Sequence, residues 1–172
     1  VFRQTTARLP WLLIGMLGGI GNSMILGNFD TTFAAHPEMA LYIPLIGGTG
    51  GNVGTQSSAL VVQGLANSSL DANNTWKQIL KESVVALINA TIISMLVYIY
   101  NFVRFGATAT VSYSVSLSLF AVVMFASIFG TLVPMTLEKL KIDPAIATGP
   151  FISITNDIIG MMLYMGITVL LS

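Results

Sequence analysis

A single carboxylate, Asp157, interrupts the long apolar stretch from Pro144 to Leu171. A helix rises ~1.5 Å per residue, so this stretch spans a ~30 Å hydrocarbon core and places Asp157 near the bilayer midplane. An Asp at this depth costs about 2.5–3.5 kcal/mol of insertion free energy. Acidic groups inside membrane spans usually line a path for ions or protons. We therefore expect the Asp157 side chain to face a water-filled path. The alternative is a buried Asp satisfied by a neighbouring hydroxyl or amide.

Small and polar residues recur at helical spacing around this Asp and predict one stripe along the helix. The members of the stripe are Gly149, Ser153, Asn156, Asp157, Gly160 and Tyr164. The other face suits lipid or an apolar partner. It carries Ile154, Ile158, Met162 and Met165.

A second unusual stretch runs from Pro44 to Gln56 and is the least helix-like part of any apolar segment. It contains Gly47, Gly48, Gly50, Gly51 and Gly54, each of which costs up to about 1 kcal/mol of helix propensity relative to Ala. Such a run lets another backbone or a solvated ion come close, and it leaves carbonyls able to tilt toward a cavity. Asn52 and Gln56 lie four apart and share a face. The alternative is tight helix packing in which the two amides bond to each other. A nucleotide-binding glycine loop would need a preceding strand, which the sequence lacks here.

The composition is that of an integral membrane protein. Of 172 residues, 54% are hydrophobic and 8% are charged, whereas soluble domains carry about 25% charged residues. The chain has no cysteine, which excludes disulfides, thiolate metal sites and cysteine nucleophiles. No signal peptide is recognisable at the start. The sequence begins abruptly at Val1, and we expect it to be a segment of a longer protein.

Five apolar segments separated by polar turns predict an all-α membrane protein with five transmembrane helices. The segments cover Leu9–Phe29, Met39–Leu65, Ile79–Val103, Val111–Leu137 and Pro144–Leu171. Six basic residues fall on the side of the N-terminus, and Arg104 alone falls on the other side. The positive-inside rule therefore predicts a cytoplasmic N-terminus and an outer C-terminus in an inner or plasma membrane. A β-barrel would need alternating segments of about ten residues, much shorter than these.

Two stretches of the chain resemble the MgtE family of magnesium channels. The glycine run, Pro44…Gly47-Gly48-Thr49-Gly50-Gly51-Asn52-x-Gly54-x-Gln56, looks like the signature of that family. The stretch Asp143-Pro144-Ala145…Gly149-Pro150…Thr155-Asn156-Asp157-x-x-Gly160 is similar to its fifth helix. The resemblance covers essentially the whole chain. We therefore expect residues 1–172 to be an MgtE-like transmembrane pore domain, with the family's cytoplasmic regulatory domains lying outside this chain.

The resemblance implies a homodimer with an ion pore on its two-fold axis, lined by the second and fifth helices. The family's ion-selecting Asp maps to Asp157, and Asn52 and Gly48 map near the pore. Ser153, one turn before the Asp, is expected to offer a backbone carbonyl. These four residues are the expected metal site. The sequence departs from the family at Gly149, which is Asn in some relatives, and at Asn156.

The residue types suit Mg²⁺ as the transported ion and ligand. Mg²⁺ gives up water reluctantly and is usually held by one or two carboxylates with several waters kept. One Asp157 from each of two chains supplies such a pair. His36 is the only histidine and lies outside the spans, so softer metals have no preferred ligand within them. The expected partners are Mg²⁺, the lipid bilayer and a second copy of the chain, with no nucleic acid.

Three alternatives to a Mg²⁺ channel remain open. One is a sodium-coupled Mg²⁺ carrier, as eukaryotic relatives of the family are described. Another is an intramembrane aspartyl protease with two Asp157 carboxylates paired across a dimer. Such enzymes supply both Asp residues in one chain and carry a Gly-x-Gly-Asp element that is absent here, so we do not expect an enzyme. The third is a non-transporting membrane anchor, which leaves a midplane Asp beside a polar stripe unexplained.

Overall fold

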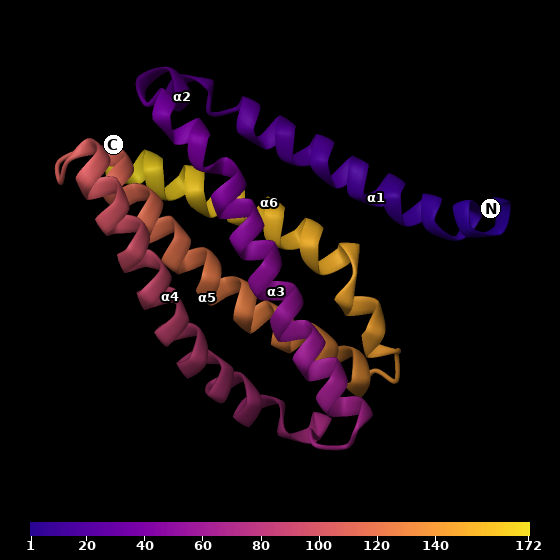
Figure 1. Cartoon of the computed structure of the whole chain (residues 1–172). Coiled ribbons are helices and arrows are strands. Elements are labelled where there is room, and N and C mark those ends of the chain that lie inside the picture. The colour runs from indigo at the N-terminus through magenta and orange to yellow at the C-terminus, as the bar shows by residue number, and fades with distance from the viewer.

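The chain folds into a bundle of long helices (Figure 1). The computed structural model describes residues 1–172 apart from the side chains of Ala147 and Thr148. Every regular element in this described part is helical. In chain order the elements are α1 (Phe2–Gly27), α2 (Asp30–Ala35), the 3₁₀ turn η1 (Pro37–Tyr42), α3 (Ile43–Ala66), η2 (Ala72–Asn74), α4 (Thr75–Phe105), α5 (Thr110–Lys139), η3 (Pro144–Thr148) and α6 (Pro150–Leu171).

Helix α5 is the centre of the bundle, because α3, α4 and α6 all pack against it. Its sequence alternates serines with Val and Leu near the start of the helix, and residues from most of its length are buried. Small side chains let transmembrane helices approach closely where lipid is as apolar as the helices themselves. Such a close approach occurs at Gly130, where an added Cβ would lie 2.5 Å from the carbonyl oxygen of Gly54 on α3.

Helix α1 lies at the edge of the bundle and packs mainly on α6 (Figure 1). None of its residues is fully buried. The contact is made at Gly18, where a Cβ would come too close to the Ile154 side chain of α6. The chain then turns through α2 and η1 into α3, which runs back beside α6.

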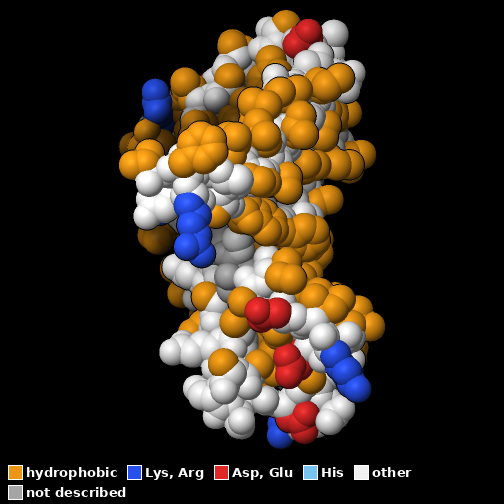
Figure 2. Space-filling model, turned by 90° about the vertical axis from the view of Figure 1, so that its right-hand side faces the viewer, with side chains coloured by type: hydrophobic (Ala, Val, Ile, Leu, Met, Phe, Trp, Pro, Cys, Tyr) orange, Lys and Arg blue, Asp and Glu red, His pale blue; other side chains and the backbone are white. Residues whose placement is uncertain are grey.

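Four helical segments, Phe2–Gly27, Ala72–Phe105, Thr110–Lys139 and Pro150–Leu171, are long and apolar enough to cross a membrane. Helix α3 is similarly long, with 24 residues, but its glycines and amides lower its hydropathy. With α3 the chain has five long helices, as the sequence predicted. Figure 2 shows apolar side chains over most of one face, with most of its acidic side chains toward the end that carries the α3–α4 and α5–η3 connections and its basic side chains both there and farther up.

Two sequence expectations need correction. The last helix does not begin at Pro144: that residue opens the short turn η3, and α6 starts at Pro150 after a non-helical Gly149. Proline lacks an N–H and fits the first turn of a helix, so each of the two prolines begins a separate element. The glycine run does not break its helix either, since α3 is continuous from Ile43 to Ala66. Packing against α5 and α6 outweighs the weak propensity of its glycines.

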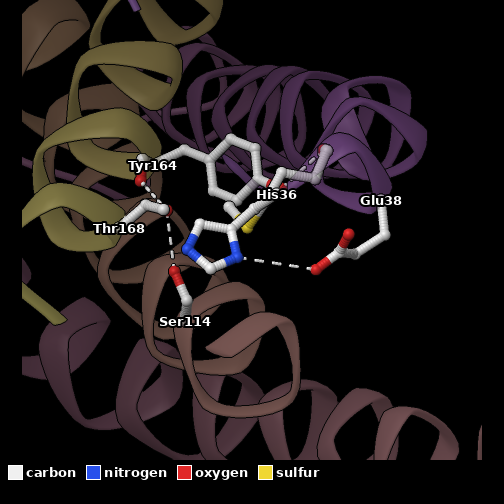
Figure 3. A network of polar contacts seen from close by, with 6 residues as sticks. His36, Glu38, Ser114, Tyr164 and Thr168 are labelled. Carbon is white, nitrogen blue, oxygen red and sulfur yellow. Dashed lines mark hydrogen bonds and ion pairs between the residues drawn. The ribbon is translucent and has the colours of Figure 1, made fainter. Parts of the chain in front are cut away.

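Hydrogen bonds between buried side chains join the helices at the end where α2, η1 and the C-terminus lie (Figure 3). The Tyr164 hydroxyl donates to the Met39 carbonyl of η1 at 2.7 Å. The Thr168 hydroxyl donates to the Tyr164 carbonyl at 2.7 Å, so the 2.7 Å contact between Thr168 and Ser114 of α5 uses the Ser114 proton. His36 Nδ1 lies 3.7 Å from Glu38 Oε1 beside this network. These contacts hold the turn that leads into α3.

We expect Tyr164→Phe to destabilise the bundle without touching the polar groove described below. The substitution removes the hydroxyl and leaves the buried Met39 carbonyl without its donor, which costs about 1–3 kcal/mol. The thermal unfolding midpoint in detergent should fall. Tyr98→Phe is the control, because Tyr98 is 36% exposed on α4 and should change the midpoint little. Equal midpoints for the Tyr164→Phe variant and the wild-type chain would contradict the role of this bond.

Candidate ion-binding groove

A groove of about 410 Å³ lies between α1, α3 and α6. Its lining residues come from these three helices: Asn22, Ile43, Gly47, Gly48, Gly51, Asn52, Thr55, Ser153, Asp157 and Met161. Gly48 and Asn52 are exposed although they line it. The groove therefore opens on the surface of the single chain.

The α3 wall is formed by glycine backbone facing the Asp157 carboxylate. A Cβ added at Gly47 would lie 3.6 Å from Asp157 Oδ1, and one added at Gly51 would lie 3.8 Å from the same atom. A Cβ at Gly48 would meet nothing within 4 Å. Any longer side chain at Gly47 or Gly51 would occupy the space in front of the carboxylate. The glycines thus keep the approach to Asp157 open.

The remaining glycines of the run face the bundle interior instead. A Cβ at Gly50 would lie 2.8 Å from Val122 of α5. A Cβ at Gly54 would collide with the Asn156 amide and lie 3.1 Å from Ile152 Cγ2. The glycine run therefore has two roles. Glycines on one face of α3 line the groove, and glycines on another face pack against the core.

Helix α6 divides its polar stripe in the same way. Ser153 and Asp157, four residues apart, line the groove. Asn156, Gly160 and Tyr164 are buried in the bundle. Asn156 is 1% exposed, and neither atom of its amide has a partner among the described residues. The expected single stripe is therefore two rows, and only the Ser153–Asp157 row belongs to the groove. The other face is also mixed, since Met165 is buried and Ile154 contacts α1.

Neutral oxygens surround the one carboxylate of the groove. The Thr55 hydroxyl lies on the wall and donates to the carbonyls of Gly51 and Asn52, at 2.8 Å and 3.1 Å. In the described part of the chain, no Lys, Arg or His forms an ion pair with Asp157. No three His, Cys, Asp or Glu side chains cluster there as a metal cage either. The groove thus offers one negative charge and several hydrogen-bonding groups, which suits a cation that keeps its water.

The four expected metal-site residues all lie on this groove. Asp157, Ser153, Asn52 and Gly48 come from two helices that are about 100 residues apart in sequence, and the fold brings them together. His36 does not line the groove and pairs with Glu38. Sequence reasoning missed Asn22, Ile43, Thr55 and Met161. For Asn22 a signal existed, since it is a polar residue four positions after Gly18 in an apolar helix.

Long apolar helices around a groove with one unpaired carboxylate define an integral membrane protein with a candidate cation site. The chain belongs to the MgtE family, whose sequence model, described as a divalent cation transporter, matches residues 43–167. The match runs from the start of α3 into α6 and so includes both helices that carry the four residues.

Three relatives are each named magnesium transporter MgtE. The protein from Bacillus subtilis is 33% identical over 160 residues, which is 93% of this chain. Those from Thermus thermophilus and Enterococcus faecalis are 33% and 29% identical, each over 96% of this chain. The chain spans 35–36% of the length of these relatives.

Proposed function

We propose that this chain carries hydrated Mg²⁺ across a membrane through a pore that two copies form together. The observation that carries the proposal is the Asp157 carboxylate, which faces an open, glycine-walled groove without a basic partner in the described structure. An uncompensated carboxylate in a membrane span is costly, and a passing cation offsets that cost. The magnesium transport named for the relatives supports Mg²⁺ as the ion.

In the proposed site, Asp157 supplies the charge that selects a divalent cation. Neutral groups around it hydrogen-bond the waters that the ion retains: the Asn52 amide, the Ser153 carbonyl and backbone groups at Gly48. Mg²⁺ favours such a site because it dehydrates reluctantly and keeps several waters when carboxylates bind it. The activity is transport of an ion and not catalysis. The N-terminus lies in the cytoplasm, as the distribution of basic residues indicates.

The direct test is Mg²⁺ uptake into vesicles that contain the purified chain and a Mg²⁺-sensitive dye. Uptake that saturates with external Mg²⁺ and is absent from empty vesicles is the expected result. Recording from a planar bilayer then distinguishes a channel, with discrete openings, from a carrier. Absence of any Mg²⁺ flux or Mg²⁺-dependent thermal stabilisation would refute the proposed function.

We expect the chain to form a symmetric dimer. The groove exposes Gly48 and Asn52, and polar backbone at membrane depth is tolerated where protein or water covers it. A second copy covers this surface and adds the second carboxylate that one chain lacks. The mass of the particle in mild detergent should be that of two chains.

The absence of native cysteine makes a sharper test possible, because one introduced cysteine is unique in each chain. Asn52→Cys on the groove should form a disulfide-linked dimer under mild oxidation. Leu96→Cys, 62% exposed on α4, is the control and should stay largely monomeric on a denaturing gel. A monomeric particle that still conducts Mg²⁺ would exclude the dimeric pore.

A further inference from the structure

Helix α1 reaches the groove through one residue, Asn22. The family model begins to match at residue 43, after α1 has ended, whereas the relatives align over 93–96% of the chain, α1 included. The residue is half-buried within a helix whose remaining surface is largely apolar and exposed. An amide at such a position is costly in a membrane span unless it has a polar partner.

The contact between α1 and α6 fixes the height of Asn22. Gly18 packs against Ile154 so closely that no Cβ fits, and α1 and α6 run in the same direction (Figure 1). Asn22 lies four residues beyond Gly18, about 6 Å along the axis and on the same face. Asp157 lies three residues beyond Ile154, about 4.5 Å along α6. Asn22 therefore stands at nearly the level of Asp157, slightly nearer the outer end.

The side-chain oxygen of Asn22 lacks a hydrogen-bond partner. Asn22 Oδ1 is buried, and no described residue donates to it. A buried amide oxygen accepts hydrogen bonds, and leaving one without a donor costs free energy, so such groups almost always have a partner. The groove beside it contains the Asp157 carboxylate, which when ionised can only accept. Asn22 lines the groove, and a turn of its amide would bring this oxygen to the groove wall, where a donor that enters the groove can reach it.

We infer that Asn22 accepts a hydrogen bond from a water of the hydrated divalent cation that Asp157 holds, so that α1 is part of the ion site together with α3 and α6. A hydrated cation presents only water O–H groups at its surface, and these match both acceptors. The inference deepens the proposed function and rests on it. Asn22 tunes the affinity for the ion, whereas Asp157 supplies the charge.

Three substitutions at Asn22 separate this role from a structural one. Asn22→Leu keeps a similar volume but removes the acceptor, and it should raise the half-saturating Mg²⁺ concentration about three- to tenfold, as expected for one lost hydrogen bond. Asn22→Asp places a second carboxylate beside the ion and should lower that concentration below the wild-type value. Asn22→Gln keeps an amide oxygen and should lie between the Leu variant and wild type.

The measurements are Mg²⁺-dependent thermal stabilisation and Mg²⁺ uptake, made on the same reconstituted preparations. Asn89→Leu is the matched control, because Asn89 is an exposed amide on α4 away from the groove. If wild type binds Mg²⁺ and Asn22→Leu binds it equally well, the inference is wrong while the proposed function stands. Weaker Mg²⁺ binding by Asn22→Asp would also overturn it, even if Asn22→Leu does not fold. A wild-type chain that neither binds nor carries Mg²⁺ would instead refute the proposed function itself.

Discussion

Replacing Asp157 with Asn should abolish Mg²⁺ transport while leaving the bundle folded. The substitution keeps the size and shape of the side chain but removes the one formal charge of the groove. At an effective dielectric of ~20, unit charges 4 Å apart attract by about 4 kcal/mol, so Mg²⁺ binding should weaken at least about a hundredfold. A neutral amide is less costly than a carboxylate at the midplane, so the helix should insert at least as well.

Two further variants at the same position sharpen this test. Asp157→Glu keeps the charge but narrows the space for retained waters, and it should retain partial uptake. Asp157→Ala should match Asp157→Asn in transport. Uptake and Mg²⁺-dependent stabilisation are measured on the same preparations. Wild-type values for Asp157→Asn in both measurements would mean that the Asp is structural and that the ion path lies elsewhere.

A side chain at Gly51 should block transport, whereas the same side chain at Gly54 should unfold the bundle. The Cβ of a leucine at Gly51 would lie 3.8 Å from Asp157 Oδ1, and the rest of the side chain would fill the groove. Uptake should then fall at least about tenfold, while the thermal midpoint stays near that of wild type. At Gly54 the first carbon already collides with Asn156, and overpacking a well-packed core costs about 1–3 kcal/mol or more. The midpoint of Gly54→Leu should therefore drop sharply.

The control for both is Gly27→Leu, at an exposed glycine near the end of α1 with open space around it. It should change neither uptake nor stability. Uptake and thermal unfolding are compared across the three variants in parallel. If Gly51→Leu transported normally, the ion path would not run along the groove. A fully stable Gly54→Leu would contradict the packing at the α3–α6 junction.

The long helices and the position of Asp157 beside an open polar space could be predicted from the sequence, because both depend on the cost of polar groups in a bilayer. The start of α6 could not, since Pro144 and Pro150 are equally good first-turn residues and only packing selects the second. Spacing alone also grouped Asn156 with Asp157. Adjacent helical residues point about 100° apart, and the positions of α3 and α5 decide which of them faces the groove.

The residues through which α1 contacts α6 and the groove could not be predicted from the sequence, for a different reason. Several glycines of α1 would allow close packing, but only at Gly18 is α6 in close contact, whereas Gly15 and Gly19 meet nothing within 4 Å. Which of several glycines makes the contact depends on the rotation of the whole helix about its axis. Because the contact lies at Gly18, it is Asn22 that lies at the groove.

Asn156 faces the bundle core and Asp157 faces the groove, and this difference limits how α6 could move. Asn156 is inserted beside Gly54, where α3 also meets Gly130 of α5. Turning α6 about its axis to swing the carboxylate away from the ion would drag this amide out of a three-helix junction. A torsional gate at α6 is therefore disfavoured. In the proposed pore, translation or tilting of α3 and α6 together would keep this junction intact and leave the carboxylate facing the groove.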